Sequence, residues 1–428
     1  MALWREVNLG EVLEVVRNGT TAPQVSERTG FPVSRIETIA SGTIDWSRIG
    51  FLRASEASYL LRPGDILYSH INSVAHVGKV ALYEGAAPLH HGMNLMLLRA
   101  RSDRVHPRFL HAVLASTHGR AHARRECKSA INQASLSQAD ITGFTFLLPP
   151  LEQQDRICRI LDTLDTTIRQ TEAIIEKLKQ VKQGLLHDLL TRGIDANGEL
   201  RPPQSQAPHL YKDSPLGWIP KEWSARSLGD LSLTMTNGFV GTALPHYSED
   251  NDAVPYLYGK NVRPNLVDIG SCTRVSARFH RQQAKSQLAP GDLLTVQSGH
   301  IGTTAVVPTW LGEANCHALI ITRLAATDVV PEYIACYCNS ALGLRSMSGI
   351  FVGSTIPHIN VKDFKRYLIP MPRRRDEQQM ICVALDLADR RVKAEDEELA
   401  KLRLMKSGLM DDLLTGRVRV TPLLVATS

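Results

Sequence analysis

The chain contains one long stretch of sequence twice. The segment "EQQDRICRILDTLD" begins at Glu152, and "EQQMICVALDLAD" begins at Glu377. At an offset of 224 residues, positions 157–191 and 381–415 are identical at 14 of 35 sites, and both stretches end in "DLLT". Average composition alone would give about two matches over that length. The chain is therefore an internal duplication, and we expect its fold to be built from two related halves.

The regions that precede the repeated stretches also match each other. "WREVNLGEVLEVVRNG" from Trp4 and "WSARSLGDLSLTMTNG" from Trp223 share the tryptophan, Leu-Gly-acid and Asn-Gly at the same spacing. "LRPGDILYS" (61–69) corresponds to "LAPGDLLTV" (288–296). Each half is then a variable region of about 150 residues followed by a helical region. A repeat of this length indicates pseudo-symmetry rather than a solenoid.

These correspondences predict an α+β fold in six segments. Short apolar or alternating runs cut by Gly and Pro are typical of strands, and a helical pattern follows Pro107 and Pro331, so each variable region should be mainly β with one or two small helices. The connector is rich in proline and should be extended. The predicted segments are the variable regions 1–150 and 223–370, the repeated helices 151–195 and 371–420, the linker 196–222 and the C-terminal tail 421–428.

Apolar residues in the repeated helices alternate in steps of four and three, which is typical of a coiled-coil seam. Polar residues interrupt both seams at equivalent positions, Thr171 with Glu395 and Lys182 with Lys406. We therefore expect the two helices to pair as an antiparallel coiled coil with that register, although each helix could instead fold onto its own variable region. The seam residues, which we also assign to pairing and partner docking, are Ile157, Leu161, Leu164, Ile168, Leu178, Leu185 and Leu189, with Ile381, Leu385, Val392, Leu399, Leu402, Leu409 and Leu413.

Composition limits the class of protein. The hydrophobic fraction is 43% and the charged fraction 21%, as in globular proteins, and no apolar run approaches the ~18 residues of a membrane span. Glu6 falls where a signal peptide would be apolar, so we expect a cytoplasmic protein without a membrane partner. The seven cysteines are scattered and form no C-x-x-C pair, which favours reduced thiols.

No recognisable catalytic motif occurs. The chain has no G-x-x-x-x-G-K-[ST], no G-x-G-x-x-G after a strand, and no Asn/Asp-Pro-Pro-aromatic tetrapeptide of the kind that amino-methyltransferases use. His90 with His91, and His118 with His122, are the best metal candidates, but neither pair has a third ligand nearby. We therefore predict a non-catalytic chain without a metal or cofactor of its own.

The positive charge lies mainly in the variable regions. The chain has a net charge of +6, and residues 1–150 hold sixteen Lys and Arg against twelve Asp and Glu. Basic clusters occur at 118–128 and 276–285. Such groups suit DNA phosphates, but a solvated helix face supplies them just as readily. The helix 152–192 balances seven acidic against seven basic residues, which favours a strut or a protein-docking surface over a DNA-reading helix.

The order of these features resembles the DNA-specificity subunit of type I restriction–modification enzymes, over essentially the whole chain. The motifs that carry the resemblance are the "P…EQQ…I" step into each helix, "DLLT" at each helix end, and "LGWIPKEW" with "LGDL" at the entry to the second variable region. The resemblance implies two target-recognition domains that read the halves of a bipartite, gapped, asymmetric site in double-stranded DNA. It also implies that the paired helices dock two modification (methyltransferase) subunits, that restriction subunits join them, and that S-adenosylmethionine and ATP with Mg²⁺ bind those partners.

Base reading calls for polar side chains on loops of a rigid scaffold, and "SHINSVAHVGK" (69–79) and "QSGHIG" (297–302) are such loops at matching places. A turn or surface role remains open for every residue chosen on this basis. The candidate DNA-binding residues are Arg17, Asn18, Arg35, Ser69, His70, Asn72, His76 and Lys79 in the first variable region, and Asn237, Tyr258, Lys260, Asn261, Gln297, Ser298, His300, Ser354 and His358 in the second.

Two other functions remain open from the sequence. The chain could be a stand-alone DNA-modifying or DNA-cleaving enzyme with an unrecognised site, which would act on DNA without partners. It could also be a coiled-coil protein scaffold that ignores DNA. Salt-sensitive binding that discriminates one gapped sequence would separate the specificity subunit from the scaffold.

Overall fold

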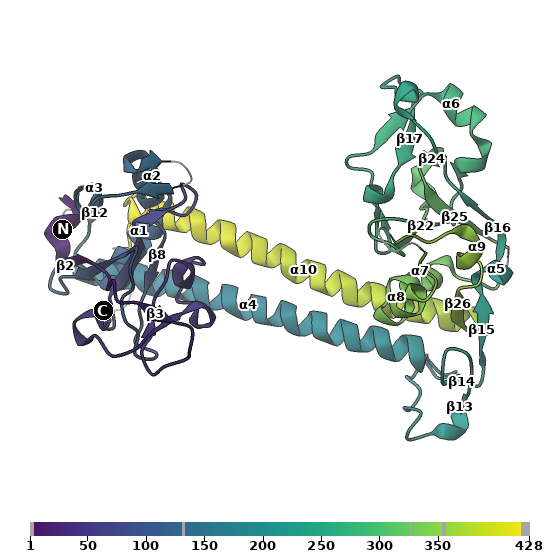
Figure 1. Ribbon diagram of the computed structural model, residues 1–428, viewed down its shortest axis with the longest axis horizontal. Coiled ribbons are helices and arrows are strands. Elements are labelled where there is room, and N and C mark those ends of the chain that lie inside the picture. Colours follow the sequence, from purple (N-terminus) through teal and green to yellow (C-terminus); the bar gives the residue numbers. More distant parts are fainter. Residues whose placement is uncertain (1–3, 131–132, 326, 353–356, 421–428) are drawn as a thin grey trace. The chain divides into compact units, whose positions relative to one another are not determined.

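The computed structural model describes residues 4–130, 133–325, 327–352 and 357–420. The chain divides into two compact units, and the first is discontinuous in sequence (Figure 1). Described residues up to Ala173 and from Asp396 onwards form unit 1, and Ile174–Glu395 form unit 2. Both boundaries fall inside long helices. Each unit therefore combines one variable region with parts of both repeated helices.

Unit 1 is built on an antiparallel four-stranded sheet of order β2–β9–β6–β8, comprising β2 (Leu13–Asn18), β6 (Ile66–Ser69), β8 (Val80–Leu82) and β9 (Leu95–Ala100). The central strands β6 and β9 are almost wholly buried, which accounts for their continuous apolar sequence. The other strands of the unit form smaller sheets: β1 (Arg5–Asn8), β3 (Gln24–Val25), β4 (Pro32–Val33), β5 (Gly50–Leu52), β7 (Ile71–Asn72), β10 (Lys128–Ala130), β11 (Gln133–Ser135) and β12 (Thr145–Leu148).

Unit 2 repeats this sheet as β16–β25–β22–β23, comprising β16 (Ser232–Asn237), β22 (Leu293–Val296), β23 (Thr304–Val306) and β25 (Leu319–Leu324). A second four-stranded sheet, β20–β17–β24–β21, is added to it. The remaining strands are β13 (Tyr211–Lys212), β14 (Ile219–Pro220), β15 (Trp223–Ser227), β17 (Val254–Leu257), β18 (Val262–Arg263), β19 (Leu266–Val267), β20 (Thr273–Val275), β21 (Gln287–Leu288), β24 (Ala314–Cys316) and β26 (Leu368–Pro372).

The shared "PGD" motif has the same role in both sheets. Asp65 accepts two hydrogen bonds from Arg99 at 2.7 and 2.8 Å, and Asp292 accepts two from Arg323 at 2.8 and 2.7 Å. Both aspartates are buried, so each needs a charged partner with this paired geometry. The duplication read from the sequence is thus also a duplication of internal contacts.

Each helical pattern after a proline is a pair of helices. Pro107 opens α1 (Pro107–Ala115), which is followed by α2 (Thr117–Glu126), and Pro331 opens α7 (Pro331–Asn339), which is followed by α8 (Ala341–Ser348). The break falls at Ser116 and Ser340, whose side chains cap the second helix of each pair. The other short helices are α3 (Gln138–Thr142), α5 (Leu228–Leu231), α6 (Ala277–Gln282) and α9 (Val361–Phe364).

The two repeated helices, α4 (Leu151–Thr191) and α10 (Arg375–Leu414), pack together (Figure 1). In unit 1, Asp165 pairs with Lys406, and Glu172 pairs with Arg403 at 2.7 Å. The numbering rises along α4 as it falls along α10, so the helices are antiparallel. In unit 2, Lys182 pairs with Asp389. These are the residues equivalent to Lys406 and Asp165, so the polar seam positions Lys182 and Lys406 each form an ion pair between the two helices.

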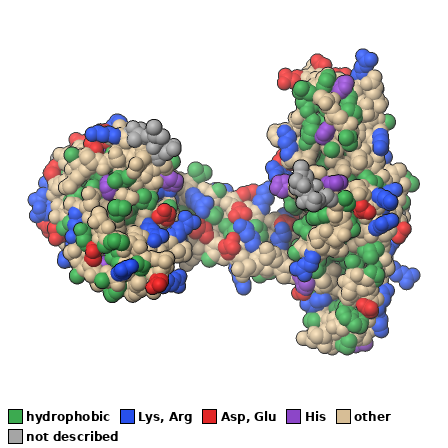
Figure 2. All heavy atoms as spheres, in the orientation of Figure 1, with side chains coloured by type: hydrophobic (Ala, Val, Ile, Leu, Met, Phe, Trp, Pro, Cys, Tyr) green, Lys and Arg blue, Asp and Glu red, His purple; other side chains and the backbone are tan. Residues whose placement is uncertain are grey.

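Every predicted seam residue is buried or half-buried, so the coiled-coil assignment is confirmed. On the face drawn in Figure 2 the paired helices show acidic and basic side chains intermixed, as their charge balance predicts. No helix in the described part of the chain combines the length and the apolar character that crossing a membrane requires.

The ends of both helices also enter the cores of the units, so the alternative left open by the sequence is correct in part. In unit 1 the core includes residues from the start of α4 and the end of α10; in unit 2 it includes the end of α4 and the start of α10. Six seam residues therefore belong to the cores of the units. Their side chains stabilise the folded units and are not, as we had expected, exposed to a docking partner: Ile157, Leu161, Leu413, Leu189, Ile381 and Leu385.

The repeated "EQQ" joins each helix to the strands beneath it. Gln154 is fully buried: its Oε1 accepts from the His106 N–H at 2.7 Å, and its Nε2 donates to the carbonyls of Pro149 and Arg104 at 2.8 and 3.2 Å. The equivalent Gln378 makes the same three bonds in unit 2, at 2.8, 3.0 and 3.1 Å. In each unit one side chain thus satisfies three backbone groups, one in the proline-rich step and two in the segment that precedes α1 or α7.

The preceding position of the repeat, Gln153 or Glu377, holds a tryptophan. The indole N–H of Trp4 donates to Gln153 at 2.8 Å, and that of Trp223 donates to Glu377 at 3.0 Å. Glu377 is buried and also pairs with Arg201 at 2.5 Å, which fixes the linker onto unit 2. The matching Trp, Gln/Glu and Gln positions are therefore a structural junction, which explains why the sequence repeats them.

We predict that Gln378→Ala lowers the free energy of unfolding by about 1–3 kcal/mol, because it leaves a buried backbone N–H and two carbonyls without partners. Gln379→Ala is the matched control, because the adjacent Gln379 is exposed and should change stability by less than about 0.5 kcal/mol. Chemical denaturation of the two variants checks this. Equal stability of the two variants would show that the junction does not depend on the buried amide.

Candidate nucleic-acid interface

In unit 1 the candidate DNA-binding loops meet at one edge of the main sheet. Asn18 at the end of β2 lies opposite Met96 of β9, and Ser69 at the end of β6 lies opposite Leu95. The segment 69–79 then leads into β8 at the same edge. Two groups of residues separated by about 50 positions in the sequence are thereby brought together. We call this the loop edge of unit 1; the helix junction lies beyond the start of β2, at the other end of the sheet.

A hairpin that the sequence did not single out completes the loop edge. Strand β11 of the β10–β11 hairpin pairs with β7, with Ala134 opposite Asn72, and the Leu136 N–H donates to the His70 carbonyl at 2.8 Å. The hairpin therefore lies directly against the candidate loop 69–79. Its strands are only three residues long, and a short polar run of this kind carries little strand signal before its partner is known.

Unit 2 has the same loop edge. Asn237 ends β16 opposite Ile320, Val296 ends β22 opposite Leu319, and the candidate loop that begins at Gln297 follows β22. The Ile359 N–H donates to the Gln297 carbonyl at 3.1 Å, as Leu136 does to His70 in unit 1. His358 is exposed beside this contact, whereas the candidate Ser354 lies outside the described residues.

The best-matched candidates are His76 and His300, at equivalent positions in the two units. The carbonyl of each accepts the N–H of the residue three positions later at 3.2 Å, and both side chains are exposed. A rigid turn therefore presents an imidazole outward from each loop edge. Four further candidates are also exposed and make no side-chain hydrogen bond or ion pair among the described residues: Asn18, Lys260, Ser298 and His358.

Five candidates are half-buried or exposed but already held within their own unit. Arg17 lies over the Tyr59 ring at 5.0 Å from its centroid. Arg35 donates to Gln24 at 2.5 Å, and the Asn72 amide donates to the Ser69 hydroxyl at 3.0 Å. Lys79 donates to the Ala40 carbonyl and the Tyr258 hydroxyl bonds that of Tyr247. These side chains would have to exchange a partner to contact DNA. Asn237 and Gln297 are half-buried, and their contact with DNA remains a prediction.

Three candidates have buried side chains, and the structure gives them a supporting role in place of the predicted base contact. Ser69 is the last residue of β6 and His70 follows it; both are buried, and burial lowers the pKa of His70. Asn261 closes a turn by accepting from the Tyr258 N–H and donating to the Asp268 carbonyl, both at 2.9 Å. The sequence alone could not separate these residues from their exposed neighbours, because strand ends carry polar residues of both kinds.

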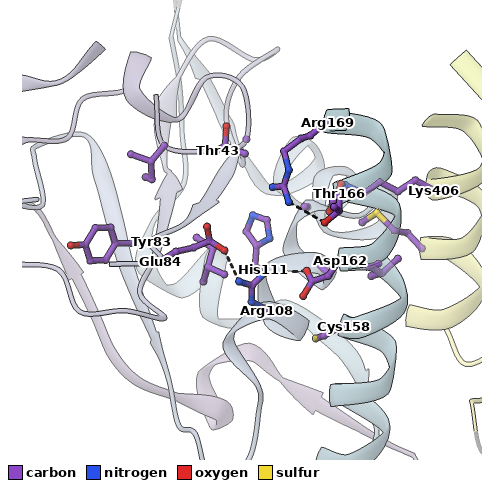
Figure 3. Close-up of a pocket in the computed structure, with 18 of the residues that line it drawn as sticks. Thr43, Tyr83, Glu84, Arg108, His111, Cys158, Asp162, Thr166, Arg169 and Lys406 are labelled. Atoms are coloured by element: carbon purple, nitrogen blue, oxygen red, sulfur yellow. Dashed lines mark hydrogen bonds and ion pairs between the residues drawn. The ribbon is translucent and has the colours of Figure 1, made fainter. Parts of the chain in front are cut away.

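A cavity of about 690 Å³ lies in unit 1 between α1, β8 and α4 (Figure 3). Arg108 spans it, donating to Glu84 at 2.6 Å and Asp162 at 3.1 Å. The His111 imidazole points into the space, and burial with the nearby Lys406 charge lowers the pKa of this histidine. Burial raises the pKa of the Cys158 thiol to about 12, so the thiol is protonated at neutral pH. The charged groups neutralise one another, and no activated nucleophile results.

The histidines considered as metal ligands have other partners. His91 bonds the Leu95 carbonyl at 2.9 Å, and burial lowers its pKa to about 4. His90 bonds the Pro32 carbonyl at 2.9 Å, and His118 and His122 each bond a backbone carbonyl in unit 1. Within the described ranges no group of three His, Cys, Asp or Glu side chains is arranged to hold a metal ion.

An exposed apolar residue recurs at an equivalent position on a repeated helix of each unit and is a further candidate contact. Val181 on α4 is 54% exposed, and Met405, its equivalent on α10, is 57% exposed. Neither belongs to the predicted seam. Because seam residues are buried between the helices or in the unit cores, a partner protein would meet these outward residues instead.

Comparisons with known proteins agree with this arrangement. A family model described as "Type I restriction modification DNA specificity domain" matches residues 1–180 and 220–404. The chain is 30% identical over 430 residues to the putative type I restriction enzyme MjaX specificity subunit of Methanocaldococcus jannaschii, covering 97% of this chain and 94% of that one. It is 27% identical over 198 residues to the EcoKI specificity subunit of Escherichia coli K12, covering 43% and 42% of the two chains.

Two solved structures share the fold. A chain described under "complex assembly and conformational transition of the type I R-M system" matches with a TM-score of 0.60 at 18% identity, covering 97% of this chain and 98% of that one. The S subunit of a type I restriction–modification system from M. genitalium matches with a TM-score of 0.53 at 12% identity, covering 96% of each chain. The predicted architecture of two mainly β regions with two long paired helices is thereby confirmed.

Proposed function

The chain belongs to the family of type I restriction–modification DNA specificity subunits, and on that premise we propose that it reads a bipartite, gapped and asymmetric site in double-stranded DNA. One observation carries the proposal: the same loop edge is built twice on the same scaffold, with different side chains. Two different reading surfaces imply two different half-sites. Members of this family recognise DNA rather than catalyse, which agrees with the absence of a known catalytic motif from the sequence.

We propose that each loop edge reads its half-site through exposed polar side chains in the major groove. In unit 2 the loop after Asn237 adds Val240 and Leu244, which are 71% and 68% exposed and suit contact with thymine methyl groups. Unit 1 carries the exposed Val74 and Met93 on its own loops. The differences between these residues give each unit its own sequence preference.

We predict that His76→Ala and His300→Ala each alter one half-site only. Loss of a base contact costs about 1–3 kcal/mol of discrimination at that base pair. Selection of bound sequences from a randomised duplex pool, with the chain assembled with its modification subunits, measures both preferences. The two variants serve as controls for each other because the residues are structural equivalents. Changed preference at both half-sites in one variant would contradict the assignment of one half-site per unit.

The proposal includes a structural role for the helices in setting the gap. Helix α4 is 41 residues long, about 60 Å at ~1.5 Å per residue, without a break among the described residues. A strut of that length can hold two reading surfaces at separate half-sites, which dimer-like DNA-binding proteins place near one duplex turn apart. The bases read would then depend on the loop edges, and the gap would depend on the helices.

We predict that inserting one heptad into both helices, after Ala173 and after Glu395, lengthens the preferred gap by about three base pairs. Seven helical residues add ~10 Å and preserve the phase of the seam. The same pool selection measures gap and bases together. Seven residues inserted after Ser205 in the linker should leave the gap unchanged. An unchanged gap in the helix variant would remove the proposed role of the helices.

We propose further that the helices dock two modification subunits, and that restriction subunits join through them. S-adenosylmethionine, and ATP with Mg²⁺, would bind those partners in the cytoplasm and not this chain. The support is the equivalence of Val181 and Met405: a duplicated chain that presents the same exposed apolar position twice suits two copies of one partner.

We predict that Val181→Asp removes one modification subunit, that Met405→Asp removes the other, and that the double variant binds neither, because an added charge cannot be buried unpaired at an apolar interface. Light scattering of the assembled complexes measures the stoichiometry. The control is Val418→Asp, which changes an exposed valine beyond the end of α10. Two bound subunits in the double variant would place the docking surface elsewhere.

A further inference from the structure

A basic cleft lies in unit 1 between α2 of the variable region and α10 of the coiled coil. Its volume is about 340 Å³, and Arg120 and Arg124 line one side while Arg403, Lys406 and Ser407 line the other. The single carboxylate of the lining, Asp411, accepts a hydrogen bond from Thr117. The α2 wall belongs to the variable region, whereas the α10 wall belongs to the repeated helix. The cleft therefore joins the two parts of unit 1 rather than lying within either.

The cations on the two walls differ in their partners. On the α10 wall, Arg403 pairs with Glu172 at 2.7 Å and Lys406 pairs with Asp165. On the α2 wall, no acidic side chain of the described residues pairs with Arg120 or Arg124. The Nη1 of Arg120 is buried without a hydrogen-bond partner in the described part of the chain. The α2 wall therefore carries a positive charge that the folded unit does not neutralise.

Arg120 of the α2 wall also contacts the loop edge. The Arg120 Nη2 donates to the Ala75 carbonyl at 3.2 Å, inside the candidate loop 69–79. Burial together with the charge of Arg120 lowers the pKa of Lys79, and burial together with Arg124 lowers that of Arg120. Arg120 is thus close enough to Lys79 on one side and to Arg124 on the other for the positive charges of each pair to repel. Groups held together against mutual repulsion favour a bound anion between them.

We propose that this cleft binds the phosphodiester backbone of the DNA duplex beside the half-site read by unit 1. The inference rests on the proposed function and extends it to a contact that carries no base information. Unpaired guanidinium groups match phosphate oxygens in geometry and charge. Continuity with the loop edge favours DNA over an acidic protein segment, because a duplex on the loop edge continues past it as a regular row of phosphates.

The contact belongs to unit 1 alone. At the equivalent positions of α8 in unit 2, Leu344 replaces Arg120 and Ser348 replaces Arg124. Leu344 is exposed and cannot bind an anion. The two half-sites should therefore differ in backbone contacts as well as in base sequence, with extra phosphate contacts on one side only.

The test uses Arg124→Gln in the full chain assembled with its modification subunits. Ethylation interference on the cognate duplex should identify phosphates beside the unit 1 half-site whose ethylation weakens binding. This interference should be lost in the variant, and no equivalent phosphates should be found beside the unit 2 half-site. Affinity should fall several-fold for every sequence, and the slope of log K against log salt should decrease by about one. Arg125→Gln is the matched control, because the neighbouring Arg125 pairs with Glu126 and does not line the cleft.

Three other outcomes would contradict the cleft contact or the proposed function. Equal effects of Arg124→Gln and Arg125→Gln, or an unchanged ethylation pattern, would overturn the cleft contact. Loss of a modification subunit from Arg124→Gln with DNA affinity intact would show that the cleft binds protein instead. Absence of sequence-specific binding by the unaltered complex would overturn the proposed function itself. The double variant Leu344→Arg, Ser348→Arg should gain phosphate contacts beside the unit 2 half-site.

Discussion

The structure depends on the burial of helix ends in the cores of the two units. Unit 1 closes on the start of α4 and the end of α10, and unit 2 closes on the end of α4 and the start of α10. Neither half of the duplication therefore completes a core from its own sequence. The Lys406–Asp165 and Lys182–Asp389 pairs hold the helices in the register in which both cores close.

This constraint separates the scaffold that the two halves share from the reading surfaces in which they differ. The Trp–Gln/Glu–Gln junction lies beyond one end of each main sheet, and the loop edge lies at the other end. Changes in the loops consequently leave the junction contacts untouched, so one scaffold can carry two different reading surfaces in a single chain. This division accounts for the sequence pattern: helices and junctions agree closely between the halves, whereas the variable regions agree at isolated positions such as "PGD".

The pseudo-symmetry of the fold does not extend to its charge. The α2 helix of unit 1 carries Arg120 and Arg124 where α8 of unit 2 carries Leu344 and Ser348, and unit 2 has a second four-stranded sheet where the smaller sheets of unit 1 have two or three strands. Packing requires equivalence only where the halves meet the shared helices. Elsewhere each unit is free to differ, and an asymmetric DNA target is the natural ligand for such a chain.

The sequence by itself determined the duplication, the α+β class and the antiparallel pairing of the repeated helices, because periodicity and repeat spacing are local properties that one chain displays directly. It also placed His76 and His300 on matching loops. Only the tertiary structure decided which polar residues face outward: Ser69, His70 and Asn261 are buried, although their sequence neighbours are exposed. It likewise decided that the β10–β11 hairpin joins the loop edge and that six seam residues belong to unit cores. Burial depends on contacts between residues far apart in the chain, and no local pattern records which distant segment will cover a side chain.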